Sequence, residues 1–408
     1  MKNRRSIWYI LSILLLLLPN LSKANHAAGG EIIYEHTGGS KYRIYFKFYR
    51  DCTGPAAPAT QPLCITETCN NTVSTITLKK WPNTGKPVSP GCSQYPTTCQ
   101  SPASTLPGYE EHWYYEDIEL PFKCDSWKFY TYIGNRNTSK NITGSSGLFF
   151  YVETTFNNTG TFEDNSSPYF SIKPVPYVCL NSPYNYNNGA IDVDGDSLVT
   201  EIVMPLTGVT SCGGTPVATT FAPASGGFPI YNLVTNPLQT SNTFTLNPAT
   251  GQISFTPTDA GAYIITFRTK EYRNGRLIGY IMRDVQVQVL VCNTSAPTFD
   301  IKANTIVNGS IVGGTVYGCI NQPLSFCFDI ISSDTETVYS IEDNHDKSVP
   351  GSNITYTNMF NDSVRGCFSW TPQDADGGKL KNLIVIAKDS TCKPPGIMLY
   401  FSYTIPIK

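Results

Sequence analysis

Histidine is scarce in this sequence of 408 residues, which contains four, and their positions do not match the spacing of metal ligands. The sequence also lacks a G-x-S-x-G segment, an H-E-x-x-H segment and a phosphate-binding loop. The sequence therefore lacks the catalytic motifs of several large enzyme classes, and we expect no enzymatic activity. Glycoside hydrolysis remains an alternative, because its two carboxylates can be distant in sequence and meet only in the folded chain.

Positive charge is not in excess, because 29 lysines and arginines stand against 31 aspartates and glutamates. No long cluster of basic residues interrupts this balance. Nucleic acids and anionic membrane surfaces are bound through clustered lysine and arginine. We therefore expect no nucleic-acid partner and no binding to anionic membranes.

Long apolar runs are missing beyond the N-terminus. Residues 2–5 are rich in basic side chains, residues 7–18 are apolar, and the small residues Ser22 and Ala24 follow. This order predicts a secretory signal peptide over residues 1–24, since a membrane span needs about 20 apolar residues. Cleavage would remove four basic residues and leave a net charge of −6. We expect a secreted or cell-surface protein without a transmembrane segment after cleavage.

An apolar stripe of helical period is also missing, whereas apolar and polar residues alternate in many segments rich in Tyr, Thr, Val, Ile and Phe. Residues 43–49, for example, place Ile44, Phe46 and Phe48 on one face of a strand. Clusters of Pro, Gly and Asn separate these segments at intervals typical of β-sandwiches. The sequence therefore predicts an all-β protein.

Part of the chain occurs twice. Residues 251–259 (GQISFTPTD) recur as residues 366–374 (GCFSWTPQD), and residues 179–183 (CLNSP) recur as residues 319–323 (CINQP). Each copy has the length of a small domain rather than of a solenoid turn. The repeat predicts two related β-sandwiches in tandem.

The repeat and the proline-rich connections divide the chain into four parts. We expect a signal peptide over 1–24, a disulfide-rich β domain over 25–172, one β-sandwich over 173–296 and a second over 297–408. Within the first domain, residues 53–107 contain four cysteines and many prolines. That composition predicts a loop-rich stretch held by disulfides.

Thirteen cysteines in an exported chain predict disulfides, because they persist in oxidising compartments. The second domain holds three, so either one thiol stays unpaired or a bridge crosses a domain boundary. Cys327 and Cys367 stand where the other copy of the repeat has Asn187 and Gln252. Two cysteines gained together at matched positions predict a Cys327–Cys367 disulfide, with two separate buried thiols as the alternative.

An acidic segment at residues 192–196 (DVDGD) places carboxylates at alternate positions around a glycine. Such oxygen atoms can converge on a hard cation, and calcium takes six to eight oxygen ligands. Further ligands are expected near predicted strand ends. The sequence thus predicts a calcium site built from Asp192, Asp194, Asp196, Glu271 and Asp259. The same pattern also fits an exposed acidic turn without a cation.

Aromatic residues allow two interpretations. Phe255 and Trp370 occupy matched places in the repeat, which predicts that both belong to sandwich cores. In the first domain, Trp81 and residues 113–115 (WYY) could form a platform for a sugar or a protein partner. Packing in the core is the favoured interpretation for these residues too.

Two regions resemble one protein family. Residues 26–34 (HAAGGEIIY) and 49–52 (YRDC) look like the start of large exported surface proteins of Bacteroidetes, of the gliding-motility-associated and adhesin-like type. Residues 179–198, which end in DVDGDSL, are similar to the cadherin-like or immunoglobulin-like module that follows in those proteins. The resemblance implies tandem cadherin-like and immunoglobulin-like β-sandwiches presented at the cell surface for adhesion.

Two functions are expected on these grounds. The leading one is a secreted or cell-surface, adhesin-like structural and binding protein, stiffened by calcium and contacting a surface glycan or a protein ligand. The alternative is a carbohydrate-binding protein that uses the aromatic residues of the first domain.

Overall fold

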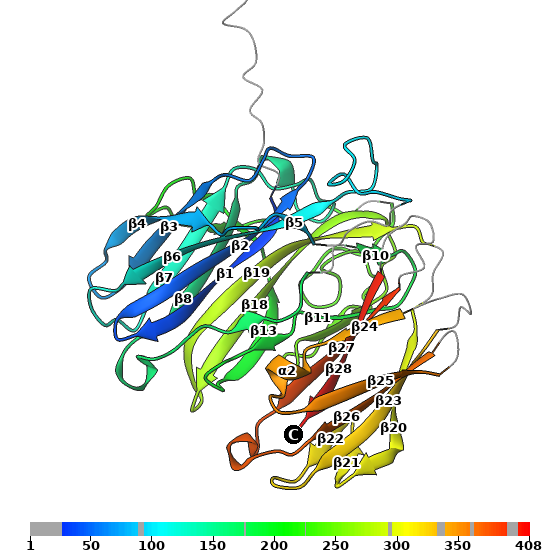
Figure 1. The fold of residues 1–408 in the computed structure, drawn as a ribbon. Coiled ribbons are helices and arrows are strands. Elements are labelled where there is room, and N and C mark those ends of the chain that lie inside the picture. The colour runs from blue at the N-terminus through cyan, green and yellow to red at the C-terminus, as the bar shows by residue number, and fades with distance from the viewer. Residues whose placement is uncertain are drawn as a thin grey trace, which may run out of the picture.

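The structure, a computed structural model, describes residues 27–88, 94–174, 177–224, 226–292, 296–332, 339–359, 363–389 and 399–408. Nearly all of its regular structure is β, so the prediction of an all-β chain is confirmed. The expected signal peptide over residues 1–24 lies outside the described residues. Figure 1 shows a large body of curved strands with a smaller C-terminal sandwich beside it.

Twelve strands form one continuous sheet. Ten of them are neighbours in the order β1 (Ala27–Gly38), β2 (Lys41–Asp51), β6 (Tyr109–Glu119), β4 (Val73–Lys80), β3 (Thr60–Glu67), β7 (Trp127–Ile133), β8 (Phe150–Phe156), β19 (Arg276–Leu290), β18 (Gly261–Arg273) and β13 (Ser197–Val203). In addition, β10 (Tyr177–Cys179) pairs with β19, and β5 (Lys86–Pro87) pairs with β6.

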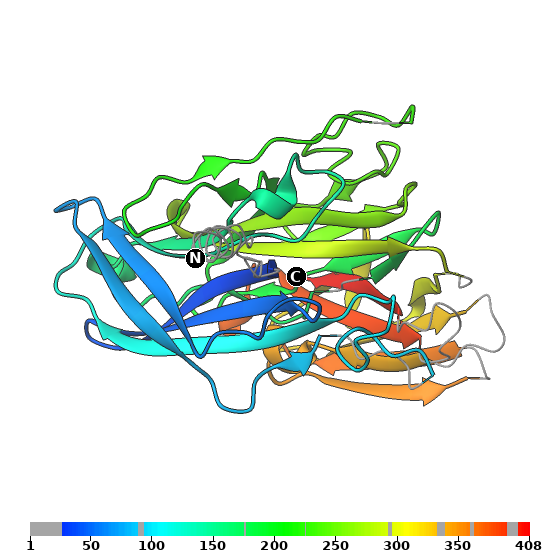
Figure 2. The ribbon, with the colours of Figure 1, turned by 90° about the horizontal axis from the view of Figure 1, so that it is seen from above.

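Strand β19 closes this row of strands. Along one edge it pairs with β18. Along the other edge it pairs in turn with β8 at residues 279–281, with β1 at residues 283–285 and with β10 at residues 288–290. The strands from β1 to β8 therefore curl until both ends of the row meet one edge of β19. Figure 2 shows the blue β1 and β2 alongside the yellow-green β19.

Two glycines permit this closure. A Cβ atom at Gly29 of β1 would lie 2.2 Å from the carbonyl oxygen of Asp284. A Cβ atom at Gly279 of β19 would lie 2.3 Å from the carbonyl oxygen of Thr155. Neither position has room for a side chain, so close approach of the backbones requires glycine at both.

Adjacent residues of β19 make two buried ion pairs. Arg283 donates to the carboxylate of Glu31 on β1, and Nζ of Lys47 on β2 lies 2.8 Å from the same carboxylate. Asp284 accepts a hydrogen bond of 2.8 Å from Arg136. All five side chains are at most 6% exposed. Loss of one partner would leave a buried charge uncompensated, so these pairs specify which strands meet at β19.

Three small sheets follow in the middle of the chain: β9 (Tyr169–Phe170) with β12 (Ala190–Ile191), β14 (Leu206–Thr207) with β15 (Val217–Ala218), and β11 (Tyr184–Asn187) with β17 (Gln252–Phe255) and β16 (Thr245–Leu246). Helical turns are few among the described residues and comprise η1 (Ser145–Gly147), η2 (Gly160–Phe162), η3 (Asp374–Asp376) and α2 (His345–Ser348).

The C-terminal part is a sandwich of two sheets. One sheet has the order β20 (Thr298–Val307), β23 (Leu324–Ile331), β26 (Ser363–Trp370) and β25 (Asn353–Asn358). The other has the order β21 (Gly309–Val312), β22 (Thr315–Gly318), β28 (Leu399–Ile407), β27 (Lys381–Asp389) and β24 (Tyr339–Asp343). Phe326 and Phe328 from the first sheet and Leu383 and Ile405 from the second share one buried core.

Both copies of the repeat use the same strand pairing. In the first copy, β11 and β17 place Tyr184 opposite Phe255. In the second copy, β23 and β26 place Leu324 opposite Trp370. Phe255 is 5% exposed and Trp370 is 8% exposed. The prediction that both aromatic residues are core residues is confirmed.

The matched polar and cysteine pairs lie directly opposite each other. Cys327 faces Cys367 across β23 and β26, and a disulfide joins them. Asn187 faces Gln252 across β11 and β17. Asn187 donates to Thr404 of β28, and Thr404 donates to Gln252, at 2.8 and 2.6 Å. The same register position thus holds a covalent link in one copy and a contact with the C-terminal sandwich in the other.

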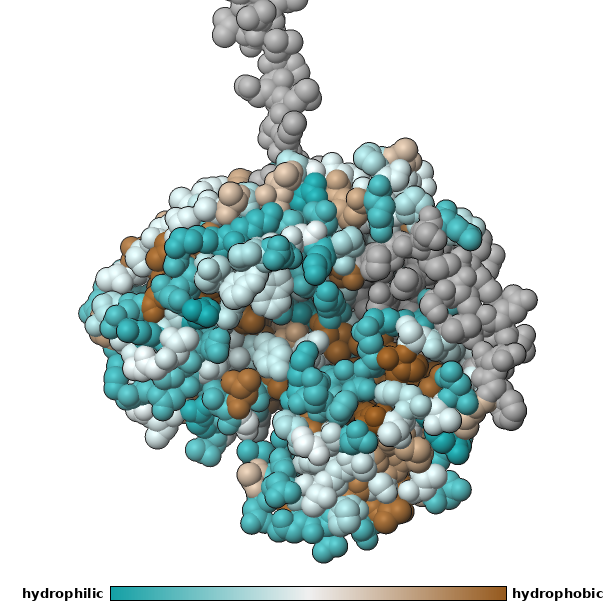
Figure 3. All heavy atoms as spheres, viewed as in Figure 1, coloured by the Kyte–Doolittle hydropathy of each residue, from teal (hydrophilic) through white to brown (hydrophobic). Residues whose placement is uncertain are grey.

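The expected segments share hydrophobic cores. One core contains Tyr109 from the first segment, Val287 from the second, and Ile384 and Tyr403 from the third. The large sheet also continues across the expected boundary at residue 172. Most large hydrophobic side chains are buried in these cores. On the face drawn in Figure 3, the hydrophobic residues that remain at the surface form small groups among hydrophilic ones.

Residues 53–107 contain more regular structure than their composition predicts. Strands β3 and β4 form a hairpin within this stretch, and Leu63 and Leu78 are fully buried in its core face. The alternation of apolar residues in both strands carries this signal, and the prolines and cysteines conceal it.

Five disulfides join described cysteines: Cys52–Cys99, Cys64–Cys212, Cys69–Cys124, Cys179–Cys292 and Cys327–Cys367. Cys319 is exposed and has no disulfide partner among the described cysteines. Cys92 and Cys392 lie outside the described residues. Of the two alternatives for the odd cysteine of the second segment, the structure shows a bridge across the boundary. Cys64 and Cys212 are separated by 148 residues.

The Cys64–Cys212 bridge can be tested by replacing both cysteines with alanine. The closed loop is long, so in the chain-entropy model its loss should lower the free energy of unfolding by up to roughly 5 kcal/mol. Denaturant unfolding measures the change, and peptide mapping without reduction should recover a peptide containing both cysteines. A map that pairs Cys64 with another cysteine would contradict the structure.

The buried carboxylate of Glu31 can be tested by Glu31→Gln. The variant leaves Arg283 and Lys47 buried without their counter-charge, which should cost about 3–5 kcal/mol of unfolding free energy. Exposed Glu119 offers the matched control, and Glu119→Gln should change the free energy by less than about 0.5 kcal/mol. Equal stabilities of the two variants in urea unfolding would contradict this role.

Candidate functional sites

The acidic turn 192–196 lies between β12 and β13. Gly195 adopts a φ of 83°, which favours glycine and allows the chain to reverse here. The register of β13 and β18 places Leu198 opposite Glu271. This pairing brings Glu271 beside the turn, although more than seventy residues separate them in the sequence.

Four carboxylates converge at this place, which we call the acidic site: Asp192, Asp194, Asp196 and Glu271. One oxygen atom from each lies within 4.8 Å of those of the others. Glu271 is 0% exposed, and neither of its carboxylate oxygens has a hydrogen-bond partner among the described residues. The same holds for Oδ2 of Asp192. Unpaired buried carboxylate oxygens are costly, and oxygen atoms that converge in this way could hold a cation.

The other oxygens of the acidic site hold neighbouring segments in place. Asp194 accepts a hydrogen bond of 2.8 Å from the backbone N–H of Ser166. Asp192 accepts one of 2.7 Å from the N–H of Asp196. Arg273 donates to Asp196 at 2.6 Å and also to Asn165 at 2.7 Å. Nζ of Lys379 also faces the turn, 2.9 Å from where a Cβ atom at Gly195 would lie. One guanidinium and one ammonium group thus stand against four carboxylates, which leaves the site negative when all are ionised.

Burial and the neighbouring negative charges raise the pKa values of two carboxylates of the acidic site. Burial, together with repulsion from Asp196 and Asp194, raises the pKa of Asp192 to about 6. Burial, reinforced by the charge of Asp192, raises the pKa of Glu271 well above its usual value. Without a cation, Glu271 therefore holds a proton at neutral pH.

Asp259, the fifth predicted ligand, lies elsewhere. It precedes β18, whereas Glu271 lies near the other end of the same strand, roughly 33 Å from the strand's first residue at the rise of an extended chain. Its carboxylate is 2.7 Å from Nζ of Lys140 and accepts a hydrogen bond of 2.7 Å from Tyr263. Asp259 therefore forms a separate surface ion pair and does not join the acidic site.

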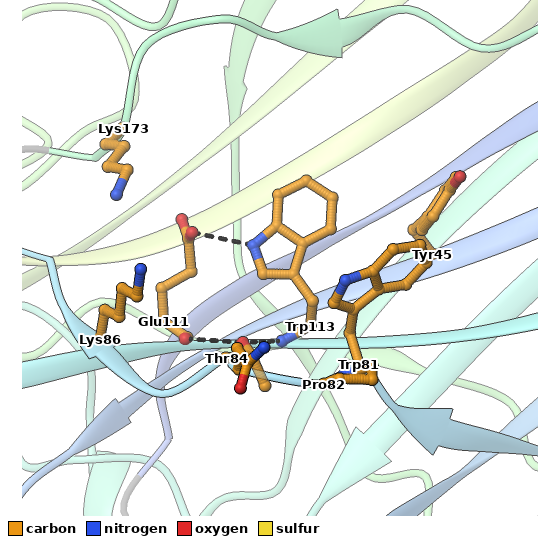
Figure 4. A pocket seen from close by; sticks show the side chains of 9 residues that line it. Tyr45, Trp81, Pro82, Thr84, Lys86, Glu111, Trp113 and Lys173 are labelled. Carbon is orange, nitrogen blue, oxygen red and sulfur yellow. Dashed lines mark hydrogen bonds between the residues drawn. The ribbon is translucent and has the colours of Figure 1, made fainter.

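A second site is a pocket of about 450 Å³ on the outer face of β2 and β6. This aromatic pocket is lined by Tyr45, Trp81, Pro82, Asn83, Thr84, Lys86, Glu111, Trp113 and Lys173. Figure 4 shows these side chains gathered around Trp113 and Glu111. The volume falls in the range of small-ligand sites.

Strand alternation decides which aromatic residues reach this pocket. Tyr114 points inward and is fully buried, whereas Trp113 and Tyr115 point to the outer face. Trp81 is 41% exposed and packs edge-to-face on Tyr115, with ring centres 4.6 Å apart. Core packing is therefore correct for Tyr114, whereas Trp81 is exposed and lines the pocket.

Polar contacts fix the centre of the pocket. Nε1 of Trp113 donates to Oε1 of Glu111 at 2.8 Å, and its backbone N–H donates to Thr84 at 2.8 Å. Nζ of Lys47 lies 4.4 Å from the centre of the Trp113 ring. These contacts hold the indole in one orientation, as a preformed binding site requires.

Several residues of the two sites were not predicted from the sequence. Ser166, Asn165 and Arg273 surround the acidic site, and Tyr45 and Lys173 line the aromatic pocket. The alternation of β2 could have placed Tyr45 on the outer face. Nothing local in the sequence indicates the others, because their contacts depend on how distant segments meet.

Comparisons with known proteins identify no family. No family model matches the chain, and no curated protein matches it. Among solved structures, Dpr2 immunoglobulin domains in complex with DIP-Theta align with 9% identity and a TM-score of 0.19, over 94% of this chain and 99% of that chain. Cadherin-like domains 1 to 4 of zebrafish RET align with 9% identity and a TM-score of 0.17, over 85% and 71%. Likeness at this level carries no argument about function.

None of the helices in the described part of the chain combines the length and the apolar character that crossing a bilayer demands.

The protonated state of Glu271 predicts how stability depends on pH in chelator. The folded protein binds a proton that the unfolded chain releases above about pH 4.5, so stability should fall as pH rises from about 4.5 to about 10. Glu271→Gln should flatten this slope, as measured by urea unfolding at each pH. Asp164, whose side chain is 90% exposed, offers the control, and Asp164→Asn should keep the slope. Equal slopes in both variants would contradict the assignment.

Proposed function

We propose that the protein is a secreted or cell-surface, adhesion-type binding protein whose rigid β body is completed by a calcium ion. The ion would be held by Asp192, Asp194, Asp196 and Glu271. Five disulfides among the described residues support an extracellular location, because such bonds persist in oxidising compartments. The resemblance to exported surface proteins of Bacteroidetes, with gliding-motility-associated and adhesin-like members, supports the same role.

One observation carries the calcium proposal: both oxygens of a fully buried carboxylate, Glu271, have no partner among the described residues. A structural carboxylate would be expected to pair with an arginine, lysine or backbone N–H group. The nearby guanidinium of Arg273 is instead engaged by Asp196 and Asn165. Oxygen donors without nitrogen or sulfur ligands suit a hard cation such as calcium rather than zinc.

Calcium at this place would stiffen a junction between distant segments. Asp194 binds the backbone at Ser166, while Glu271 belongs to β18 in the large sheet. Bound calcium would supply positive charge that offsets repulsion among the carboxylates and would tie these segments together. A rigid body transmits load to a bound surface without unfolding, which suits adhesion.

The calcium proposal can be tested by thermal unfolding of the mature chain. Millimolar calcium should raise the melting temperature by several degrees relative to chelator, as expected for about 2–3 kcal/mol of binding energy at 100 times the dissociation constant. Glu271→Gln and Asp194→Ala should abolish the rise, and Asp164→Asn should retain it.

Isothermal titration calorimetry with calcium alone gives an independent measurement. It should report one site that is lost in Glu271→Gln. Identical melting curves of the natural chain in chelator and in calcium, together with no binding heat, would reject the site.

The aromatic pocket favours carbohydrate binding as a second function. An exposed tryptophan beside fixed polar groups, in a pocket of about 450 Å³, matches the apolar faces and hydroxyl groups of a sugar ring. The two functions are compatible, because the acidic site and the aromatic pocket share no residue. In this case the pocket would supply the contact and the calcium site the stiffness.

A further inference from the structure

Two lysines of the aromatic pocket have no acidic partner in the described part of the chain. Lys86 of β5 and Lys173, which follows β9, are both exposed. Neither ammonium group lies within 4.0 Å of a carboxylate among the described residues. Figure 4 shows both on the Glu111 side of the pocket, away from Tyr45 and Trp81. The pocket is thus apolar on one side and positively charged on the other.

The fold holds both lysines in place. The backbone of Lys86 pairs with Glu111 in the sheet. Lys173 follows Ile172, whose carbonyl accepts a hydrogen bond of 2.8 Å from the buried Arg283. Two charges from distant segments are therefore brought to one pocket by ordered backbone, which reduces the entropy lost when a ligand binds.

Glu111 offsets only one of these two positive charges. Its Oε1 accepts the hydrogen bond from the indole N–H of Trp113, which holds the carboxylate beside the ring. Its Oε2 accepts no hydrogen bond from a described residue and can receive one from a ligand hydroxyl group. Two ammonium groups against one carboxylate leave a net positive charge at this end.

We propose that the aromatic pocket binds a saccharide that carries a negatively charged substituent, a carboxylate or a sulfate. The sugar ring lies against Trp81 and Trp113, its hydroxyl groups reach Glu111 and Asn83, and its anionic group lies between Lys86 and Lys173. This inference rests on the carbohydrate-binding function proposed above and adds the charge of the ligand.

An acidic peptide fits the pocket less well. Peptides commonly bind by adding a strand to an open sheet edge. Among the described strands, β2 is paired on both sides by β1 and β6, and β6 is paired by β2 and by β4 and β5. The pocket lies over paired strands, so it offers a concave surface to a compact ring rather than an edge to an extended chain.

Calorimetry on the full mature chain tests the inference with four probes: a uronic-acid oligosaccharide, the same oligosaccharide with its carboxylates methyl-esterified, a sulfated oligosaccharide and an acidic peptide. At least one anionic sugar should bind at least about tenfold more tightly than the neutral ester, because charge-assisted hydrogen bonds are lost in the ester. Binding should weaken as salt rises. Comparison of the carboxylated and sulfated probes identifies the anionic group.

Three variants locate the site. The double variant Lys86→Gln/Lys173→Gln should reduce affinity for the anionic sugar about tenfold or more and leave affinity for the neutral ester unchanged. Trp81→Ala should weaken both sugars. Lys41→Gln, at an exposed lysine of β2, is the matched control and should change neither. Melting temperatures of all variants equal to that of the natural chain show that the fold is intact.

The negative outcomes separate the two proposals. If the neutral ester binds as tightly as both anionic sugars, the charge inference fails and carbohydrate binding stands. If no sugar binds at millimolar concentration, both fail. If the acidic peptide binds and the sugars do not, the pocket is a peptide site and the inference is overturned. The calcium response of the acidic site is measured separately and is unaffected by any of these results.

Discussion

The carboxylate of Glu31, buried between Arg283 and Lys47, is the interaction on which the rest of this structure depends. It joins β1, β2 and β19, the strands at which the large sheet closes. Burial alone would raise the pKa of Glu31, but the two cations outweigh it and lower the pKa, so the carboxylate stays ionised. Three buried charges are stable together and costly apart, which makes the pairing of these strands specific as well as strong.

The same cluster connects to both candidate sites. Arg283 also donates to the carbonyl of Ile172 and to Asn188, at 2.8 and 3.1 Å. Ile172 precedes a lysine of the aromatic pocket, and Asn188 precedes the strand that leads into the acidic turn. Lys47 lies against the ring of Trp113. The two sites are thus positioned by one set of buried contacts, although they share no residue.

Much of this molecule was predictable because its signals are local or duplicated. Period-2 alternation predicted strands, and the repeat predicted that Phe255 and Trp370 are core residues, which their burial confirms. The acidic turn was visible as a motif, and the structure places the carboxylate of Glu271 beside it. Asp259 was named for the same reason, a place beside a strand end, but it flanks the opposite end of β18. The ends of a strand can be estimated from sequence. Which of the two ends lies beside a given turn depends on the tertiary fold and cannot be estimated in this way.

The sequence by itself determined the all-β class, the twofold module and the chemistry available at each position, because side-chain period and residue type act over a few residues. Only the tertiary structure determined which segments share one sheet and one hydrophobic core. The closure at β19, the bridge from Cys64 to Cys212 and the arrival of Lys173 beside Trp113 join residues far apart in the chain. Such contacts depend on how whole sheets pack and on which buried charges form ion pairs. Neither of these can be determined from a local sequence pattern.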